Sequence, residues 1–420
     1  MLAAIQLSLG PKMRLSQWIL SSDGMGGNAG VAEGVAWLNG RLDLPHEGGS
    51  EPQARKHDAA YVAETDQVFN VFPPMIPILT VLLRPLHAAL GFPQEFWAPW
   101  TYTWLVFWPL PIVGFVVFRR QVGDPIWAAV LTLGWMGGTA VLPNLHGAMG
   151  GLLGPVDHVV SQVGLLVFSA DILGRRRIWP ALIGLLIATY TRQMTFLYAL
   201  PLIWVAAQKG RRELVTCFLG MAIIATPLLT LNYLKFGNPL DFGYRYIYAG
   251  REDEALGKRC LETGTFAIEF VPENAYYMHV APPDVSVSPT GVRICETNQY
   301  GTSIWITTPL LALVILSAPR WWRDGSRRIL MLGSLPVLLG LLCYHSPGFI
   351  EHGYSRFALD FLPLWLLVIA PETRGRLRTW FTLGCIAWSL LYFQAIVPDS
   401  AVVGYPVMRQ PLSAVYNGQV

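Results

Sequence analysis

Two carboxylates in the N-terminal polar segment are candidates for catalytic chemistry. Asp23 precedes a glycine-rich turn and would be the first acid outside the membrane if a helix came before it. A carboxylate at the lipid interface suits a general base or a metal ligand; the alternative is a solvated or helix-capping residue. Asp58, beside His57, is the second candidate. The His and acidic residues of this segment show no i, i+4 spacing of the kind that binds a metal from one helix face. The sequence therefore does not identify a metal.

Three arginines stand where an anionic group could bind. Arg192 is the only charge in the apolar run from 178 to 207, Arg245 lies in an aromatic stretch, and Arg356 lies at the mouth of a late apolar run. A guanidinium holds a phosphate through two parallel hydrogen bonds. The alternative for Arg192 and Arg356 is that each extends harmlessly to the membrane interface.

Aromatic residues accompany two of these arginines. Tyr244 and Tyr246 flank Arg245, and His352 and Tyr354 precede Arg356. Rings that alternate with charged groups suit a sugar, whose apolar faces stack on aromatic rings while its hydroxyls hydrogen-bond to charged groups. For residues 232–246 the alternative is a loop whose aromatic side chains pack onto the membrane surface.

The composition places these residues in a membrane protein. Of the 420 residues, 53% are hydrophobic and only 14% are charged, against about 25% charged in a soluble domain. Mean hydropathy is +0.41, more apolar surface than one soluble core could bury. A net charge of +3 on 420 residues is too small to attract a polyanion, which argues against nucleic-acid binding.

Uncharged runs of membrane length recur along the chain, and about 20 residues suffice for a helix to cross the hydrocarbon. The run from 178 to 207, interrupted only by Arg192, lies between two basic clusters and must cross an even number of times, so we expect a short helical hairpin with Arg192 at its outer turn. The total comes to about ten transmembrane helices, in an all-α polytopic fold. The other runs are 98–118, 125–143, 159–170, 214–231, 303–319, 329–344, 357–371 and 379–397.

Basic clusters in the short linkers give the orientation. Five clusters hold 15 of the 30 Lys and Arg: 119–120, 175–177, 209–212, 320–328 and 374–378. The positive-inside rule places these linkers in the cytoplasm. Two long polar segments then face outward, which predicts a multi-pass protein of the cytoplasmic (inner) membrane with its chemistry on the extracytoplasmic face.

Six segments follow from this topology. Residues 1–72 form an N-terminal segment and first extracytoplasmic loop, and 73–97 an interfacial or re-entrant helix and turn. Residues 98–231 and 303–397 hold the transmembrane helices, 232–302 the second extracytoplasmic loop and 398–420 an extracytoplasmic tail. Nothing before residue 21 is apolar for long enough to cross a membrane, so we expect that a first transmembrane helix is missing.

Two of the five cysteines share the second long loop. If that loop faces an oxidising compartment, Cys260 and Cys295 are candidates for a disulfide, and the alternative is that they stay unbridged. No C-x-x-C spacing occurs anywhere in the chain, which argues against a zinc site or a disulfide framework.

Taken in chain order, these motifs resemble a bacterial branch of the GT-C superfamily of membrane glycosyltransferases, which includes protein mannosyltransferases and lipid A aminoarabinose and core-sugar transferases. The resemblance covers most of the chain as an ordered series of short motifs. They are Asp23, Gly-Arg-Leu-Asp-Leu at 40–44, Phe-Pro-Pro at 72–74, the stretch 232–246, Gly-Tyr-Ser-Arg-Phe at 353–357 and Asp-Phe-Leu-Pro at 360–363.

The resemblance implies transfer of a sugar from a polyprenyl-phosphate donor to a lipid, glycan or protein acceptor on the outer face. Asp23 would then activate the acceptor hydroxyl, while Arg356, Arg192 and Arg245 would neutralise the departing phosphate. A divalent cation, Mg²⁺ or Mn²⁺, is the candidate cofactor. The Asp-Glu pair of many members reads Asp23-Gly24 here, so the adjacent carboxylate is absent.

Two other classes of function remain open. A non-catalytic relative in an envelope-assembly complex would explain the loss of the second acid and of the first helix. A lipid transporter or flippase would need a polar path through the membrane, yet the predicted spans carry few charges, Asp360 among them.

Overall fold

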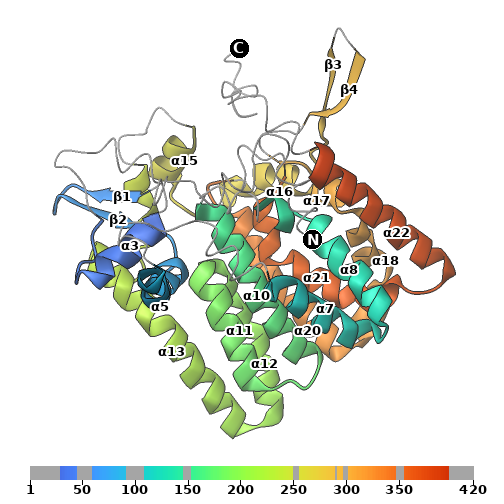
Figure 1. The fold of residues 1–420 in the computed structure, drawn as a ribbon, viewed down its shortest axis with the longest axis horizontal. Coiled ribbons are helices and arrows are strands. Elements are labelled where there is room, and N and C mark those ends of the chain that lie inside the picture. Colours follow the sequence, from blue (N-terminus) through green and yellow to red (C-terminus); the bar gives the residue numbers. More distant parts are fainter. Residues whose placement is uncertain are drawn as a thin grey trace.

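The computed structural model describes residues 29–44, 59–90, 108–144, 153–248, 255–288, 291–296, 301–346 and 354–396. Asp23, Asp58 and His352 lie outside these residues. The protein is mostly helical: its long helices form a bundle, and elements of the two long polar segments lie at one end of it (Figure 1).

The first half of the chain supplies many of the bundle helices and a small strand pair. Its elements are α3 (Ala29–Leu38), β1 (Ala59–Val62), β2 (Gln67–Asn70), α5 (Met75–Ala89), α7 (Pro109–Val122), α8 (Pro125–Gly137), α10 (Leu153–Leu173), α11 (Ile178–Thr191), the 3₁₀ helix η1 (Gln193–Tyr198), α12 (Ala199–Lys209) and α13 (Arg211–Phe236).

The second half begins with short elements and ends in the remaining bundle helices. They are α14 (Tyr244–Ile247), α15 (Ala255–Thr263), η2 (Ile268–Phe270), α16 (Val271–His279), β3 (Asp284–Ser288), β4 (Gly291–Glu296), α17 (Ile304–Thr307), η3 (Pro309–Leu311), α18 (Ala312–Leu316), α19 (Ala318–Arg323), α20 (Gly325–Leu342), η4 (Arg356–Asp360), α21 (Leu362–Ile369), η5 (Ala370–Thr373), α22 (Arg376–Leu391) and the π-helical η6 (Tyr392–Ile396).

The protein is mostly helical, as predicted, but it also contains two antiparallel β-hairpins, so the fold is not entirely α-helical. In the first, β1 pairs with β2 from Ala59–Asn70 to Val62–Gln67, and Leu44 adds an isolated bridge to Val68. The second, β3 with β4, projects away from the bundle (Figure 1). Both lie in the polar segments, where a chain outside the hydrocarbon is free to form strands.

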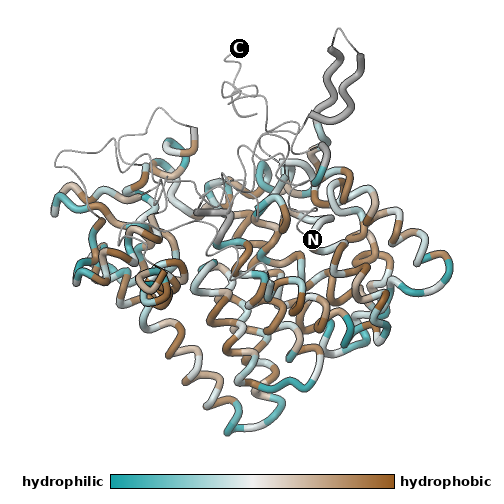
Figure 2. Tube along the Cα trace, viewed as in Figure 1, coloured by the Kyte–Doolittle hydropathy of each residue, from teal (hydrophilic) through white to brown (hydrophobic). Residues whose placement is uncertain are grey.

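Two helices of the described part are long and apolar enough to cross a membrane, α13 and α20. The hairpin expected at 178–207 is present, because α11 ends at Thr191 and η1 and α12 follow the break at Arg192. Hydrophobic residues run along these helices and hydrophilic ones gather at the turns (Figure 2). The total of ten spans stays a prediction.

Prolines divide two of the expected spans. The run 303–319 forms α17, η3, α18 and part of α19, with a break at Thr308, whose backbone leaves the helical region before Pro309. The run 357–371 is divided into η4, α21 and part of η5, with Pro363 in the first turn of α21. A proline lacks the N–H that would continue a preceding helix and restricts the residue before it.

The basic linkers gather at one end of the bundle. Arg176 donates to Ser326 Oγ and to Gln208 Oε1, which joins three linkers. Arg327 pairs with Glu372 at 3.2 Å, and Arg374 donates to the carbonyl of Val122, which brings in the other two. All five clusters therefore share the end of the bundle away from the polar segments.

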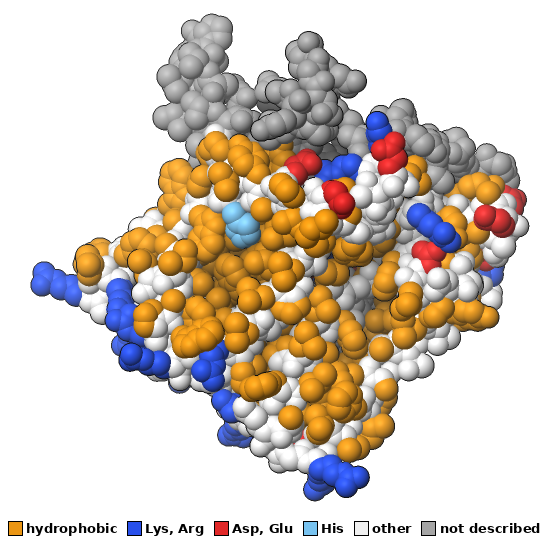
Figure 3. Space-filling model, turned by 180° about the vertical axis from the view of Figure 1, so that it is seen from behind, with side chains coloured by type: hydrophobic (Ala, Val, Ile, Leu, Met, Phe, Trp, Pro, Cys, Tyr) orange, Lys and Arg blue, Asp and Glu red, His pale blue; other side chains and the backbone are white. Residues whose placement is uncertain are grey.

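The surface of the bundle is strongly apolar. Figure 3 shows hydrophobic side chains over most of one face, with Lys and Arg along one margin. The apolar side chains that are at least half exposed include Trp179, Ile183, Leu200, Trp204, Phe218, Leu219 and Ile223 on α11, α12 and α13. A surface of this kind is typical of helices that face lipid.

The core centres on α21, all eight residues of which are buried. Beside it, α10 and α11 pack with their backbones in close approach. A Cβ at Gly184 would lie 2.5 Å from the backbone nitrogen of Phe168, and one at Gly164 2.5 Å from that of Ala188. Glycine is required at this crossing because the neighbouring atoms belong to rigid helix backbone.

We expect Gly184→Ala to destabilise the protein by about 1–3 kcal/mol, because the added methyl forces the two helices apart. The melting temperature in detergent measures this. The control is Gly384→Ala on α22, where a Cβ meets nothing within 4 Å and the melting temperature should hold. Equal melting temperatures for both variants would contradict the close approach.

Candidate functional site

A buried ion pair lies where α11 breaks. Arg192 caps the C-terminus of α11 with an extended backbone (φ −143°, ψ 96°), which turns its side chain towards η4. Its Nε lies 3.1 Å from both carboxylate oxygens of Asp360 and its Nη2 lies 2.9 Å from Oδ2. The Asp360 side chain is 0% exposed and that of Arg192 18%. Paired, hydrogen-bonded charges of this kind persist in low dielectric.

The ring of Phe357 is the platform of the site. The guanidinium of Arg192 lies over it at 4.9 Å from the ring centroid and that of Arg356 at 5.7 Å. The imidazole of His158 stacks on the same ring at 5.7 Å, with its Nδ1 3.8 Å from Asp360 Oδ1. Two positive charges are therefore held near one aromatic ring.

Three helices fix the backbone of η4. Gln162 of α10 donates to the carbonyl of Leu359 at 3.0 Å, and Tyr198 of η1 donates to the carbonyl of Asp360 at 2.8 Å. The wholly buried α21 begins directly after η4. These contacts fix the position of Asp360 in η4. Because Arg192 is hydrogen-bonded to the Asp360 carboxylate, its guanidinium is held in place as well.

An aromatic cluster from the second polar segment packs beside this pair. Tyr244 contacts Tyr344 edge-to-face at 5.9 Å, and Tyr344 contacts Phe357 at 5.7 Å. The Nε2 of His345 lies 3.0 Å from the hydroxyl of Tyr248. Electrostatic interaction links Arg192 to both Tyr244 and Tyr344. The short helix α14 thereby carries Tyr244 to the arginine site.

The pKa of His345 is lowered from 6.5 to about 4, by burial first and by the charge of Arg259 second. His345 is therefore neutral near pH 7 and can hold Tyr248 without adding a charge.

The stability of the protein should depend on pH through this histidine. Because its folded-state pKa lies below that of the unfolded chain, the unfolded state binds more protons, and stability should fall as pH falls from about 6.5 to 4 by at most about 1.4 kcal/mol per unit. In the His345→Gln variant, the stability measured by urea unfolding in detergent should no longer show this fall with pH. Identical pH profiles for the wild type and the variant would contradict the assignment.

The described residues that were predicted from the sequence to bind the donor or the sugar lie either at the arginine site or away from it. Arg192, Arg356 and Tyr244 lie in or beside the site described above. Tyr354 is buried nearby, packed edge-to-face on Phe393 at 5.6 Å. Arg245 is 62% exposed, paired with Asp241 at 2.9 Å and stacked on Tyr246.

Tyr246 itself stacks on Phe236 at 5.6 Å, in a small apolar cluster with the first hairpin. Cys260 is buried, with its Sγ 3.8 Å from the Thr265 hydroxyl oxygen, and a bridge from it to Cys295 stays a prediction. The backbone of Cys295 lies in β4, and its side chain is outside the described part.

The unassigned residues of the site include His158 and Asp360. His158 directly precedes the uncharged run 159–170, whose limits exclude it, although an Asp-His pair at the start of a span is itself a signal. Asp360 was recognised only as a charge within a predicted span. Its partner, Arg192, is 168 residues away in the chain.

A second buried ion pair holds the first polar segment to the bundle. Lys235, near the end of α13, pairs with Glu33 of α3 and donates to the carbonyl of Asn70 at 2.8 Å. The Asn70 amide donates to Glu33 at 2.6 Å. Burial raises the pKa of Glu33, and the charge of Lys235 opposes that shift. The three groups join α3, β2 and α13 at the end of the bundle that carries the site.

Removing one charge of this pair should lower the free energy of unfolding more than removing both charges. Lys235→Met leaves Glu33 buried without a counter-charge, at a cost of about 3–5 kcal/mol. Lys235→Met combined with Glu33→Leu should recover most of that loss. Chemical denaturation in detergent measures both, with exposed Lys258→Met as the control. A double variant no more stable than Lys235→Met would argue against the pairing.

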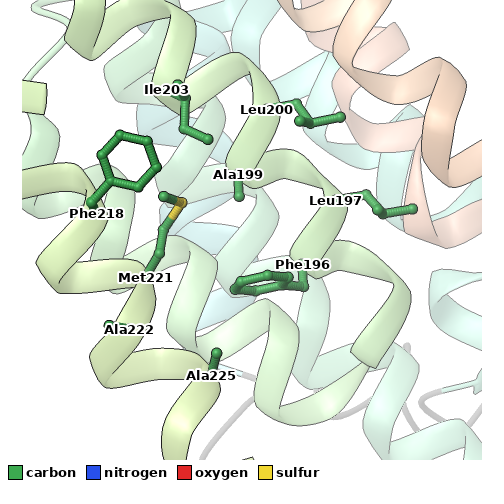
Figure 4. A pocket seen from close by; sticks show the side chains of 9 residues that line it. All are labelled: Phe196, Leu197, Ala199, Leu200, Ile203, Phe218, Met221, Ala222 and Ala225. Carbon is green, nitrogen blue, oxygen red and sulfur yellow. The ribbon is translucent and has the colours of Figure 1, made fainter. Parts of the chain in front are cut away.

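An apolar groove of about 380 Å³ begins one helical turn beyond Arg192. Figure 4 shows side chains of η1 and α12 on one side and of α13 on the other. Leu200 and Phe218 are each about half exposed, so the groove opens to the surface. The lining residues are Phe196, Leu197, Ala199, Leu200, Ile203, Phe218, Met221, Ala222 and Ala225.

Among the described residues, no group of three or more His, Cys, Asp or Glu is placed to hold a metal ion. The divalent cation stays a prediction. Comparison with protein-family models, curated proteins and solved structures finds no match to this chain.

Proposed function

We propose that this chain is an integral membrane glycosyltransferase that transfers a sugar from a polyprenyl-phosphate donor to an acceptor on the extracytoplasmic face. The observation that supports the proposal is that Arg192 and Arg356 both lie against the ring of Phe357 and that an apolar groove begins four residues after Arg192 in the chain. A polyprenyl-phosphate sugar has the matching parts: an anionic phosphate between a long apolar chain and a polar sugar.

The chemistry needs fixed positive charge at the phosphate. As the acceptor oxygen bonds to the sugar C1 atom, the bond from C1 to the phosphate oxygen breaks, and negative charge develops on the leaving phosphate. Guanidinium groups already in place stabilise that charge without reorganising. Arg192 is held by Asp360, whereas Arg356 is partly buried, and we assign Arg356 to the leaving phosphate.

The acceptor hydroxyl must lose a proton, and Asp23 is the base we propose for it. Tyr244, beside Arg192, is placed to stack on the sugar, since aromatic rings pack against the apolar faces of pyranoses. Both roles follow from the resemblance and from the aromatic cluster described above.

The distribution of charge supports the proposed orientation. The basic linkers share one end of the bundle, and the arginine site lies where α10 begins and where α11 and α20 end, which is the other end. With the linkers in the cytoplasm, the site faces outward, on the side of the two long polar segments.

We expect Arg356→Ala to lower transfer by about 10²–10³-fold, because one phosphate-stabilising group is lost. Transfer from a radiolabelled polyprenyl-phosphate sugar pool in membranes measures this at matched protein level. The control is Arg328→Ala, whose guanidinium stacks on Trp322 at the opposite end of the bundle. Equal transfer by Arg356→Ala and the control would contradict the assignment.

A non-catalytic envelope-assembly protein is the second candidate, and one observation favours it. The guanidinium of Arg192 is already neutralised by Asp360, as expected of a structural ion pair. Absence of transfer from every donor pool, with the protein retained in a stable complex, would support that function. Net movement of lipid between leaflets would instead support a flippase.

A further inference from the structure

Three arginines share one buried carboxylate at the basic end of the bundle, away from the arginine site. The Oε1 of Glu372 lies 3.2 Å from Nη1 of Arg327, and its Oε2 lies 3.1 Å from Nη1 of Arg378. The Nε of Arg320 lies 3.6 Å from the same Oε2. These contacts join α19 and the start of α20 to the start of α22. We call Glu372 and its three arginines the Glu372 cluster.

Positive charge exceeds negative charge in this cluster. Among the described residues, the one other acid that pairs with these arginines is Asp324, 3.3 Å from Nε of Arg327. Three guanidiniums therefore meet two carboxylates, which leaves one positive charge in excess. The side chains of Arg320 and Arg378 are 53% and 37% exposed, so an anion from outside can reach them.

The surrounding chain adds more positive charge. Arg323 ends α19 and Arg376 begins α22, and both side chains are exposed. The two segments 318–327 and 370–378 hold six Arg against two acids. A surface with such an excess of one sign attracts ligands of the other sign.

Large apolar side chains are exposed among these arginines. Trp322, between the arginines of α19, is 50% exposed. On α22, Leu377 is 83% exposed and Trp380 is 70% exposed. Exposed Trp beside Arg is typical of the membrane interface, where the ring lies at the level of the lipid headgroups. A small soluble anion would leave these apolar side chains in water, whereas a lipid with an anionic headgroup covers both kinds of side chain.

We propose that the Glu372 cluster binds the headgroup of an anionic phospholipid of the cytoplasmic leaflet. A phosphodiester carries one negative charge, which equals the excess positive charge of the cluster. Its oxygens accept hydrogen bonds from the exposed guanidiniums of Arg320 and Arg378, and its acyl chains pack beside the exposed side chains of α22. The bound lipid thereby ties α19 to α22.

This inference rests on the membrane location and orientation proposed above, and it does not depend on sugar transfer. With the basic linkers in the cytoplasm, the nearest lipids are those of the cytoplasmic leaflet. Anionic lipids there attract basic segments that lie next to membrane-spanning helices.

The test compares binding of dioleoyl phosphatidylglycerol and dioleoyl phosphatidylcholine to the full-length protein in detergent, measured by native mass spectrometry. We expect phosphatidylglycerol to bind about tenfold tighter, because the choline of the other lipid neutralises its phosphodiester. Arg320→Gln combined with Arg323→Gln should weaken phosphatidylglycerol binding about fivefold for each arginine removed. Phosphatidylcholine binding should not change.

Arg211→Gln combined with Arg212→Gln is the matched control. It removes the same charge from exposed residues of another linker at the same end of the bundle, and it should keep the preference for phosphatidylglycerol. If the Arg320 and Arg323 double variant does not fold, Arg323→Gln alone decides, with an expected loss of about fivefold.

Three results would overturn this inference. They are equal binding of the two lipids, equal weakening by the two double variants, and displacement of phosphatidylglycerol by an equal concentration of inorganic phosphate, which would identify a free anion as the ligand. Each of them leaves the proposed sugar transfer standing, because no sugar donor takes part in the experiment.

Discussion

The buried contact between Arg192 and Asp360 is the interaction on which the site depends. Two charges leave water here, and the cost is offset only because the guanidinium and carboxylate meet through several hydrogen bonds. The pair also has a topological effect. By binding Asp360, Arg192 joins the break after α11 to η4 and fixes where the 178–207 hairpin turns relative to the central helix α21.

The other parts of the site follow from that junction. With η4 held by Gln162 and Tyr198, Phe357 supports the second guanidinium, that of Arg356. The aromatic cluster that includes Tyr244 of α14 lies beside the pair, and the α12–α13 groove begins four residues after Arg192 in the chain. A buried charge pair and an aromatic surface thus lie at the end of the bundle opposite the basic linkers, and the apolar groove follows α12 and α13 from there. These are the parts that binding of an amphipathic anion requires.

Several of these features could be predicted from the sequence. The two basic clusters that flank an otherwise uncharged 30-residue run predicted a helical hairpin with Arg192 at its turn, because a run between two cytoplasmic linkers must cross the membrane an even number of times. Sequence periodicity could not supply the partner itself, since Asp360 is brought to Arg192 by packing of distant helices. The Lys235–Asn70 contact spans 165 residues for the same reason. Prolines shortened the expected spans, and the polar segments formed hairpins whose strands are too short to stand out in composition.

The most direct test is an electron cryomicroscopy structure of the protein in lipid nanodiscs with a non-transferable isoprenyl phosphodiester of a sugar. The account predicts phosphate density between the guanidiniums of Arg192 and Arg356, isoprenyl density along the groove between α12 and α13, and an intact Arg192–Asp360 pair. Ligand density elsewhere in the molecule, or Arg192 separated from Asp360 in the ligand-free protein, would contradict it.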